Sequence, residues 1–435
     1  MHFTVRVSVN NLEKTIVKTF GNIVTRQVYA NPGRVRRLLA AAYGLVGWRN
    51  ALLRRSGVEK AYTKMGAALS RLISKSFLHP ENSVMVNMFF PCEILHSLDI
   101  IPVFPEALSA YLVNSGCEQV FAEAAENADV PESFCSYHKI MIGFAETGVL
   151  PKPLLIANTT LACDANRLSF RRLAEYFRVP HVVVDVPDRI GGEAEHYVAE
   201  QLRAATFALE ESCQRKMDWD RLCETVGIAD RSLKSYREYL EIRGRRSLPV
   251  TMSGELYSLI ATHVLLGTPE SENYINTLKQ VAQTAPPAAG KKRILWLHIL
   301  PNWQESMRAI FDQSGRCEIL CCDLTYDVLT DMDPRRPYES MARRLLHNLN
   351  NGGAERRIAA AVHYAKKMRA DGVLLFCHWG CKQTMGLSQL AKSTLEAEGF
   401  PTLVLDGDGC DSRNVPDGQM ATRVNAFLEQ LEAEK

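Results

Sequence analysis

Cysteine is the residue type in this chain whose placement points most clearly to chemistry. Twelve cysteines occur in 435 residues, and several follow short apolar runs that are typical of buried strands. Cys163 follows LLIAN, Cys377 and Cys381 follow GVLLF, Cys92 follows SVMVNMFF and a proline, and Cys410 follows TLVLDGD. Ligands of open parallel sheets bind beyond the carboxyl ends of strands. We therefore expect these thiols to lie at a functional crevice.

Cys135 lies in ESFCSYHKIMIGF, near the predicted start of a helix, with Ser133 as a candidate N-cap. The helix dipole and the free amide groups at such a position favour a thiolate. Thiolates that converge on one crevice suit zinc or an iron–sulfur cluster. There is neither a paired C-x-x-C motif nor a ferredoxin run, so a metal site and buried inert cysteines both remain open. We expect the inert class to include Cys213, Cys223, Cys317, Cys321 and Cys322.

Short apolar runs alternate with helical patterns in two regions, which is typical of parallel βαβ units. The predicted fold class is α/β, with two Rossmann-like (flavodoxin-like) parallel-sheet domains, a helical N-terminal part and a helical insertion. The predicted strands are 83–90, 100–104, 154–158 and 181–186, and then 293–299, 318–324, 372–376 and 402–408.

The predicted domains follow from the same patterns. Residues 34–76 have helical periodicity with Arg and Lys between the apolar positions. We expect a solvated basic face there, with a membrane-surface helix as the alternative. The four parts are a helical region at 1–80, a first α/β domain at 81–190 with Cys135 and Cys163, a helical region at 191–285, and a second α/β domain at 291–435 with Cys381.

Overall charge and missing motifs exclude several function classes. The formal net charge is +2, which gives no broad positive field for nucleic acid or an anionic membrane. No run approaches the roughly 20 apolar residues of a membrane span, and the start lacks a secretory pattern, so we expect a cytoplasmic protein. Phosphate-loop, G-x-G-x-x-G and G-x-S-x-G motifs are absent from the sequence. We therefore expect no ATP hydrolysis by this chain itself.

Residues 83–435 resemble the 2-hydroxyacyl-CoA dehydratase D-component family, which includes 2-hydroxyglutaryl-CoA dehydratase and benzoyl-CoA reductase subunits. The resemblance implies that Cys135, Cys163 and Cys381 bind one 4Fe-4S cluster and leave one iron open to substrate. The segments that carry it are 89–104, 134–144, 158–167 and 372–432.

The resemblance also implies a mechanism and partners. A separate ATP-hydrolysing iron–sulfur activator protein would inject one electron at low potential. The thioester carbonyl of a 2-hydroxyacyl-CoA would become a ketyl radical anion, which expels the 2-hydroxyl. Loss of a β-proton and return of the electron would give the enoyl-CoA. The expected partners are an acyl-CoA substrate, the activator, and a homologous second subunit or a second copy of the chain.

Three further residues are candidates for catalysis. Glu93 occupies the family's P-x-E carboxylate position and could handle the substrate hydroxyl or a proton; the alternative is an acid that favours a helix N-terminus. Ser136 and His138 follow Cys135 and could hydrogen-bond cluster sulfur or substrate. The alternative for both is a local helix contact.

Two departures from the family pattern leave other functions open. Cys92 and Cys377 are extra cysteines, and Cys92 could be a fourth ligand that closes the open iron. One alternative is a related CoA-thioester or small-molecule reductase, including one of the double-cubane type. Another is a non-catalytic paralogue that binds a cluster or zinc. The upstream segment SVMVNMFF has no cysteine and Cys117 is too far downstream, which favours a single cluster.

Overall fold

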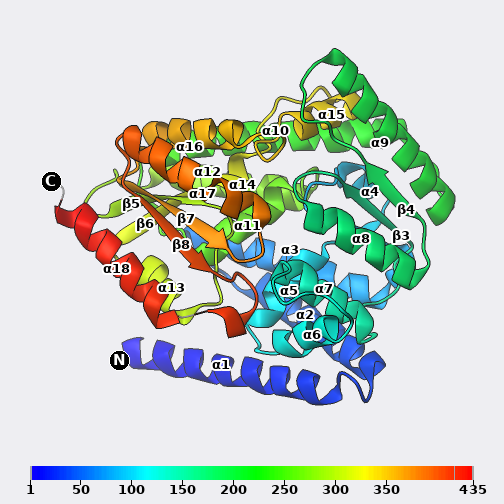
Figure 1. The fold of residues 1–435 in the computed structure, drawn as a ribbon, viewed down its shortest axis with the longest axis horizontal. Helices are drawn as coiled ribbons and strands as arrows, with labels where there is room; N and C mark the ends of the chain where they lie inside the picture. Colours follow the sequence, from blue (N-terminus) through cyan, green and yellow to red (C-terminus); the bar gives the residue numbers. More distant parts are fainter. Residues whose placement is uncertain (1, 416, 434–435) are drawn as a thin grey trace.

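Two four-stranded parallel sheets organise the computed structural model, which describes residues 2–415 and 417–433 (Figure 1). Their strand orders are β2-β1-β3-β4 and β6-β5-β7-β8. The predicted α/β class with two parallel-sheet domains is therefore confirmed. In each sheet the second strand lies on one side of the first strand, and the third strand lies on its other side. This arrangement creates a switch point between β1 and β3 and another between β5 and β7.

The two central strands of the first sheet, β1 and β3, are fully buried, as their apolar runs predict. β1 is shorter than predicted because the chain leaves the sheet at Asn87. The Asn87 side chain instead donates to the Leu161 carbonyl at 2.9 Å and accepts from the Thr159 amide at 3.0 Å. The strands are β1 (Ser83–Val86), β2 (Ile101–Val103), β3 (Leu155–Thr159) and β4 (His181–Val184).

Helices fill the connections of the first domain and cover its sheet. α8 has a strongly amphipathic pattern and packs Phe170 and Leu173 into the core. The helices are α4 (Glu93–Ser97), α5 (Pro105–Val113), α6 (Glu118–Glu126), α7 (Ser136–Glu146) and α8 (Asp164–Phe177).

The second sheet repeats this arrangement with a more continuous apolar core. All seven residues of β7 are buried, as expected for a central strand of a parallel sheet. The strands are β5 (Lys292–Leu297), β6 (Cys317–Cys322), β7 (Gly372–His378) and β8 (Thr402–Gly407). The helices are α13 (Glu305–Arg308), α14 (Asp323–Tyr326), α15 (Pro337–Leu346), α16 (Ala354–Met368), α17 (Lys382–Ala397) and α18 (Asp417–Ala433).

Long helices precede and separate the two sheets. Asn31 caps α2 by accepting from the Arg34 amide, and Pro32 occupies its first turn. Figure 1 shows α1 lying along one edge of the molecule and α10 bridging the two α/β parts. The helices are α1 (His2–Gln27), α2 (Pro32–Leu52) and α3 (Gly57–Leu78), then α9 (Gly192–Cys213), α10 (Trp219–Arg243), α11 (Met252–Thr262) and α12 (Pro269–Thr284).

The helical middle is fixed to the second sheet by a buried arginine. Arg243 ends α10 and donates to the carbonyls of Arg246 and Ile319, at 2.7 and 2.9 Å. It also lies 3.3 Å from Glu318, which balances its charge. Within the described residues, no helix combines the length and apolarity that a membrane crossing requires.

Candidate functional site

The carboxyl ends of the two sheets line one cavity. Met88 follows β1 and Cys163 follows β3, while His298 follows β5 and Cys381 follows β7. Both switch points therefore contribute to the same space, where ligands of parallel sheets are expected. The cavity has a volume of about 350 Å³, and its lining is mainly apolar.

All three predicted cluster ligands line this cavity, and each is the N-cap residue of a helix. Cys135 precedes α7, Cys163 precedes α8 and Cys381 precedes α17. Ser133 was expected to cap α7, but the helix begins at Ser136 with Cys135 itself at the N-cap. Three helix N-termini thus direct their dipoles and amide groups toward the sulfurs, which favours negative charge there.

A glycine allows the two domains to meet at the cysteines. Gly380 has φ +90°, and a Cβ atom built on it would lie 2.8 Å from the Cα of Cys135. A residue with a side chain would therefore separate the β7–α17 loop from the start of α7. This close approach brings Cys381 of the second domain next to Cys135 of the first.

The loop after β8 holds the start of α7 through buried polar contacts. Ser136 donates to Oδ1 of Asp408 at 2.6 Å, and the Tyr137 hydroxyl donates to the Gly409 carbonyl at 3.1 Å. One turn later, Lys139 lies 3.2 Å from Asp411, and both side chains are fully buried. These contacts cross the domain boundary, so they fix the position of Cys135 relative to the second sheet.

His378 at the end of β7 contacts Cys135 directly. Its Nδ1 accepts from the Gly409 amide at 3.1 Å, so the ring proton of the neutral imidazole lies on Nε2. Nε2 is 3.4 Å from the Cys135 Sγ and donates to it. Burial lowers the pKa of His378, which keeps the ring neutral near pH 7.

Neighbouring thiolates affect the ionisation of Cys135 and Cys163. Burial raises the pKa of Cys135 well above its usual value, and charges on Cys381 and Cys163 raise it further, while the His138 amide opposes the shift. Burial also raises the pKa of Cys163 to about 12, against a lowering by the Asn166 amide. Three thiolates cannot coexist in this buried space without added positive charge. A cationic iron–sulfur core would supply that charge, so the donor set fits such a group.

A single metal ion has different geometric requirements. Across residues 2–415 and 417–433, no three His, Cys, Asp or Glu side chains converge closely enough to hold one ion. The ligands of a four-iron cluster bind different irons and stand farther apart than the ligands of one ion. The lack of such a group among these residues therefore applies to sites for a single metal ion.

Glu93 does not line the cavity. It is fully buried and forms a two-point ion pair with Arg344 of α15, through a short contact of Nη1 with Oε1 and a 2.9 Å contact of Nη2 with Oε2. Its role in proton transfer remains a prediction. The two weaker ligand candidates also lie off the cavity lining: Cys92 is completely buried beside Glu93, and Cys377 lines a separate space with Asp406.

His138 lines the cavity, whereas Ser136 faces Asp408. The Ser169 hydroxyl donates to the Ala165 carbonyl at 2.7 Å, so it accepts from Nδ1–H of His138 at 2.8 Å. This leaves Nε2 of His138 as an acceptor. Burial, and then the charge of His378, lower the pKa of His138 to about 3, so its ring stays neutral.

Glu106 is the one carboxyl group among the cavity residues that the structure describes, and no sequence motif pointed to it. Glu106 is half-buried in the first turn of α5, and its Oε2 is buried with no hydrogen-bond partner among the described residues. Burial raises its pKa to about 8. The signal in the sequence is weak, because P-E-A at a helix start is typical of an ordinary first turn.

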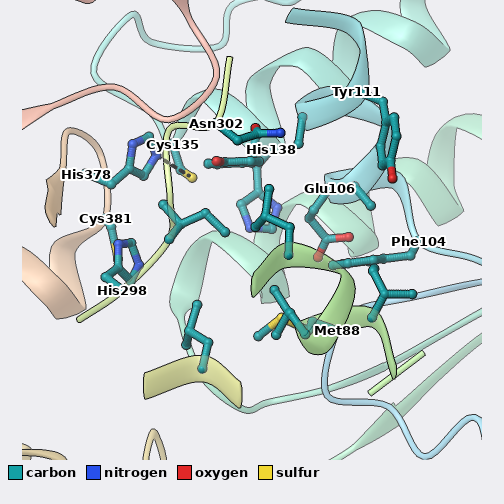
Figure 2. A pocket seen from close by; sticks show the side chains of 18 of the residues that line it. Met88, Phe104, Glu106, Tyr111, Cys135, His138, His298, Asn302, His378 and Cys381 are labelled. Carbon is teal, nitrogen blue, oxygen red and sulfur yellow. Dashed lines mark hydrogen bonds between the residues drawn. The ribbon is translucent and has the colours of Figure 1, made fainter. Parts of the chain in front are cut away.

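Figure 2 shows how the cavity is divided. Cys135, Cys381, His298 and His378 gather on one side, and Phe104, Glu106 and Tyr111 lie on the other, with His138 between them. Leu256, Tyr257 and Ile260 of α11 also line the cavity. The site therefore combines a sulfur-rich end with an apolar end.

Comparisons with known proteins cover most of the chain. A family model described as "2-hydroxyglutaryl-CoA dehydratase, D-component" matches residues 87–431. Lactoyl-CoA dehydratase subunit alpha of Anaerotignum propionicum is 24% identical over 384 residues, 79% of this chain and 89% of that protein. The (R)-phenyllactyl-CoA dehydratase alpha subunit of Clostridium sporogenes is 22% identical over 370 residues, 80% and 88% of the two chains. (R)-2-hydroxyglutaryl-CoA dehydratase subunit alpha of Acidaminococcus fermentans is 23% identical over 307 residues, which are 65% of this chain and 61% of that protein.

Proposed function

The chain belongs to the 2-hydroxyglutaryl-CoA dehydratase D-component family, and from this we propose that it is the iron–sulfur subunit of a 2-hydroxyacyl-CoA dehydratase. The proposed ligands of one 4Fe-4S cluster are Cys135, Cys163 and Cys381. The observation that carries the proposal is that three cysteines at three helix N-termini line one largely apolar cavity. The names of the relatives support the reaction class.

The proposed reaction removes water from a 2-hydroxyacyl-CoA by way of a ketyl radical on the thioester carbon. When bound, the cluster would supply a low-potential electron and an open iron for a substrate oxygen. The Nε2–H of His378 donates toward the Cys135 sulfur, and the neutral His138 offers Nε2 as an acceptor for the substrate 2-hydroxyl. The apolar lining excludes water, which protects a reactive radical from side reactions.

The apolar end of the cavity suits the acyl side chain. Phe104 and Tyr111 lie at this end (Figure 2), and Arg308 is the sole Lys or Arg among the described lining residues. A charged acyl end would lose hydration there without a matching set of cations. We propose that the acyl group is apolar rather than dicarboxylic.

A partner subunit and a separate activator are part of this proposal. The names of the relatives describe alpha subunits. Support in this chain comes from an exposed apolar stripe at i, i+3 and i+7 on α2: Leu45, Trp48 and Leu52 are 64%, 63% and 61% exposed. Such a stripe is typical of an interface. The electron would come from an ATP-hydrolysing iron–sulfur protein, since this chain has no phosphate loop.

The test is anaerobic reconstitution of the chain with a homologous second subunit, an activator protein and ATP. The proposal requires 2-hydroxyacyl-CoA to be converted to enoyl-CoA, with no conversion when ATP or the activator is omitted. Reduction of an unsaturated thioester without any dehydration would favour the alternative reductase function. Failure to bind any CoA thioester would contradict both enzyme functions.

A further inference from the structure

The proposed elimination needs a base for the C3 proton, and Glu93 at the P-x-E position is poorly placed to supply it. Glu93 is 0% exposed and is held by both guanidinium nitrogens of Arg344. An ionised carboxylate engaged at both oxygens by a buried arginine is a poor proton acceptor. Glu93 is also absent from the cavity lining, so a substrate in the cavity would not touch it.

Glu106 has the properties that Glu93 lacks. It lines the cavity, and its Oε2 has no hydrogen-bond partner among the described residues. Burial and then the charge of Cys381 raise the pKa of Cys163, and the charge of Glu106 raises it further, whereas the Asn166 amide lowers it. The Glu106 carboxyl therefore lies within electrostatic range of a proposed cluster ligand. Buried polar groups in native proteins normally have partners, and an unpaired one in a cavity marks a functional position.

The other candidate bases in the cavity are weaker. Burial, and then neighbouring charges, lower the pKa of His138 and of His298 to about 3. His378 uses Nδ1 to accept from Gly409 and directs Nε2–H at Cys135. Burial raises the pKa of Glu106 to about 8, so its carboxylate is the strongest of these bases, and a fraction of it is ionised near neutral pH.

We propose that Glu106 is the catalytic base that removes the C3 proton of the substrate. This role rests on the dehydratase function proposed above. The 2-hydroxyl leaves as hydroxide with the electron pair of its C–O bond. The C3–H bond then breaks, its proton passes to the Glu106 carboxylate, and its electron pair enters the C2–C3 π system. The single electron added beforehand is returned afterward, and the proton and hydroxide together make the released water.

The position of Glu106 suits this step. Figure 2 shows its carboxyl on the side of the cavity opposite Cys135 and Cys381, and close to the apolar wall. A thioester carbonyl at the sulfur-rich end would place C3 toward that wall. Tyr111, five residues later on α5, also lines the cavity, so α5 would follow the acyl chain with Glu106 next to its reacting part.

The experiment compares wild type with Glu106→Gln, Glu106→Asp and a matched control, Glu118→Gln, in the reconstituted two-subunit enzyme with its activator. Glu118 is also a buried carboxyl with a raised pKa, but it does not line the cavity. Iron content and the affinity for a 2-hydroxyacyl-CoA without ATP should stay within about 3-fold in every variant. In Glu106→Gln, kcat should fall by about 10²–10⁴-fold, and in Glu118→Gln it should not change.

The readout specific to proton removal is the isotope effect with substrate deuterated at C3. Glu106→Asp moves the carboxylate back by one methylene, so C–H cleavage should become slower and its isotope effect larger than in wild type. A residue with only a structural role would not change this value. The inference is wrong if Glu106→Gln keeps more than about a tenth of kcat, or if Glu106→Asp shows an unchanged isotope effect.

Different results would overturn the proposed function and the role of Glu106. Wild-type enzyme that dehydrates none of the 2-hydroxyacyl thioesters would overturn the function, and the role of Glu106 with it. Normal wild-type dehydration with an unaffected Glu106→Gln would overturn only the role of Glu106.

Discussion

Nε2 of His378 lies 3.4 Å from Sγ of Cys135, and the two residues come from different domains. The amide of Gly409 fixes the tautomer that makes this a donated hydrogen bond. Gly380, whose missing side chain leaves room for the Cys135 backbone, allows the approach. The site is therefore assembled at the domain boundary, and each domain supplies part of it.

Replacing His378 by phenylalanine should lower the reduction potential of the bound cluster. A hydrogen bond donated to a ligand sulfur stabilises the more negative, reduced state, so its loss favours the oxidised state. Redox titration followed by electron paramagnetic resonance measures the shift. The control is His363→Phe on the exposed face of α16, and an unshifted potential in His378→Phe would show that the contact does not tune the cluster.

Breaking the buried Glu93–Arg344 pair should destabilise the protein strongly. Glu93→Gln leaves the Arg344 charge without its partner in a buried position, which costs about 3–5 kcal/mol of unfolding free energy. Urea unfolding measures this loss. The exposed pair of Lys392 and Glu396 provides the control, where Glu396→Gln should change stability by less than about 1 kcal/mol. A Glu93→Gln variant as stable as this control would contradict a buried, charged pair.

Strand positions were predictable because buried parallel strands are short apolar runs between helical patterns. All eight predicted strands occur, and β1 ends early because the Asn87 side chain bonds to the Leu161 loop rather than continuing the sheet. The cysteines could be placed at strand ends and helix starts. Their convergence could not be derived from spacing, because Gly380 and the Asp408 loop bring distant segments together by tertiary contacts.

Carboxylates were harder to assign from sequence. Glu93 stands next to Pro91 and Cys92, so its sequence position suggested the site, but its partner Arg344 lies 251 residues away. Glu106 lies in no recognisable sequence motif. Its importance comes from the cavity around it and from the lack of a hydrogen-bond partner for Oε2 among the described residues. Burial and pairing depend on the folded surroundings, which local patterns do not specify.

The raised pKa of Glu106 predicts a particular dependence of stability on pH. Its ordinary pKa is 4.5, and in the folded protein it is about 8. Between these values the folded state keeps a proton that the unfolded state has lost, so stability falls as the pH rises through this window. Between pH 5 and pH 8, the free energy of unfolding of the wild type should fall by roughly 2–4 kcal/mol more than that of Glu106→Gln. Denaturant unfolding at several pH values measures this difference, and parallel curves for the two proteins would contradict the raised pKa.

The apolar wall predicts a preference among acyl groups. Phenyllactoyl-CoA should bind at least about 10-fold more tightly than 2-hydroxyglutaryl-CoA at pH 7, because an acyl carboxylate would be desolvated against Phe104 and Tyr111. Anaerobic calorimetry without ATP measures binding alone. Lactoyl-CoA, which lacks the ring, should bind more weakly than phenyllactoyl-CoA. A preference for the dicarboxylic thioester would indicate that Arg308 recognises the acyl end.

The most direct test is the iron and sulfide content of the anaerobically purified chain together with its cysteine variants. Wild type should contain about four iron and four sulfide per chain, as expected for one cubane. Cys163→Ala and Cys381→Ala should lose most of both, whereas Cys213→Ala, at the end of α9 and away from the cavity, should keep them. A Cys163→Ala or Cys381→Ala variant with full iron content, or a wild-type chain that binds no iron, would contradict a cluster held by these three sulfurs.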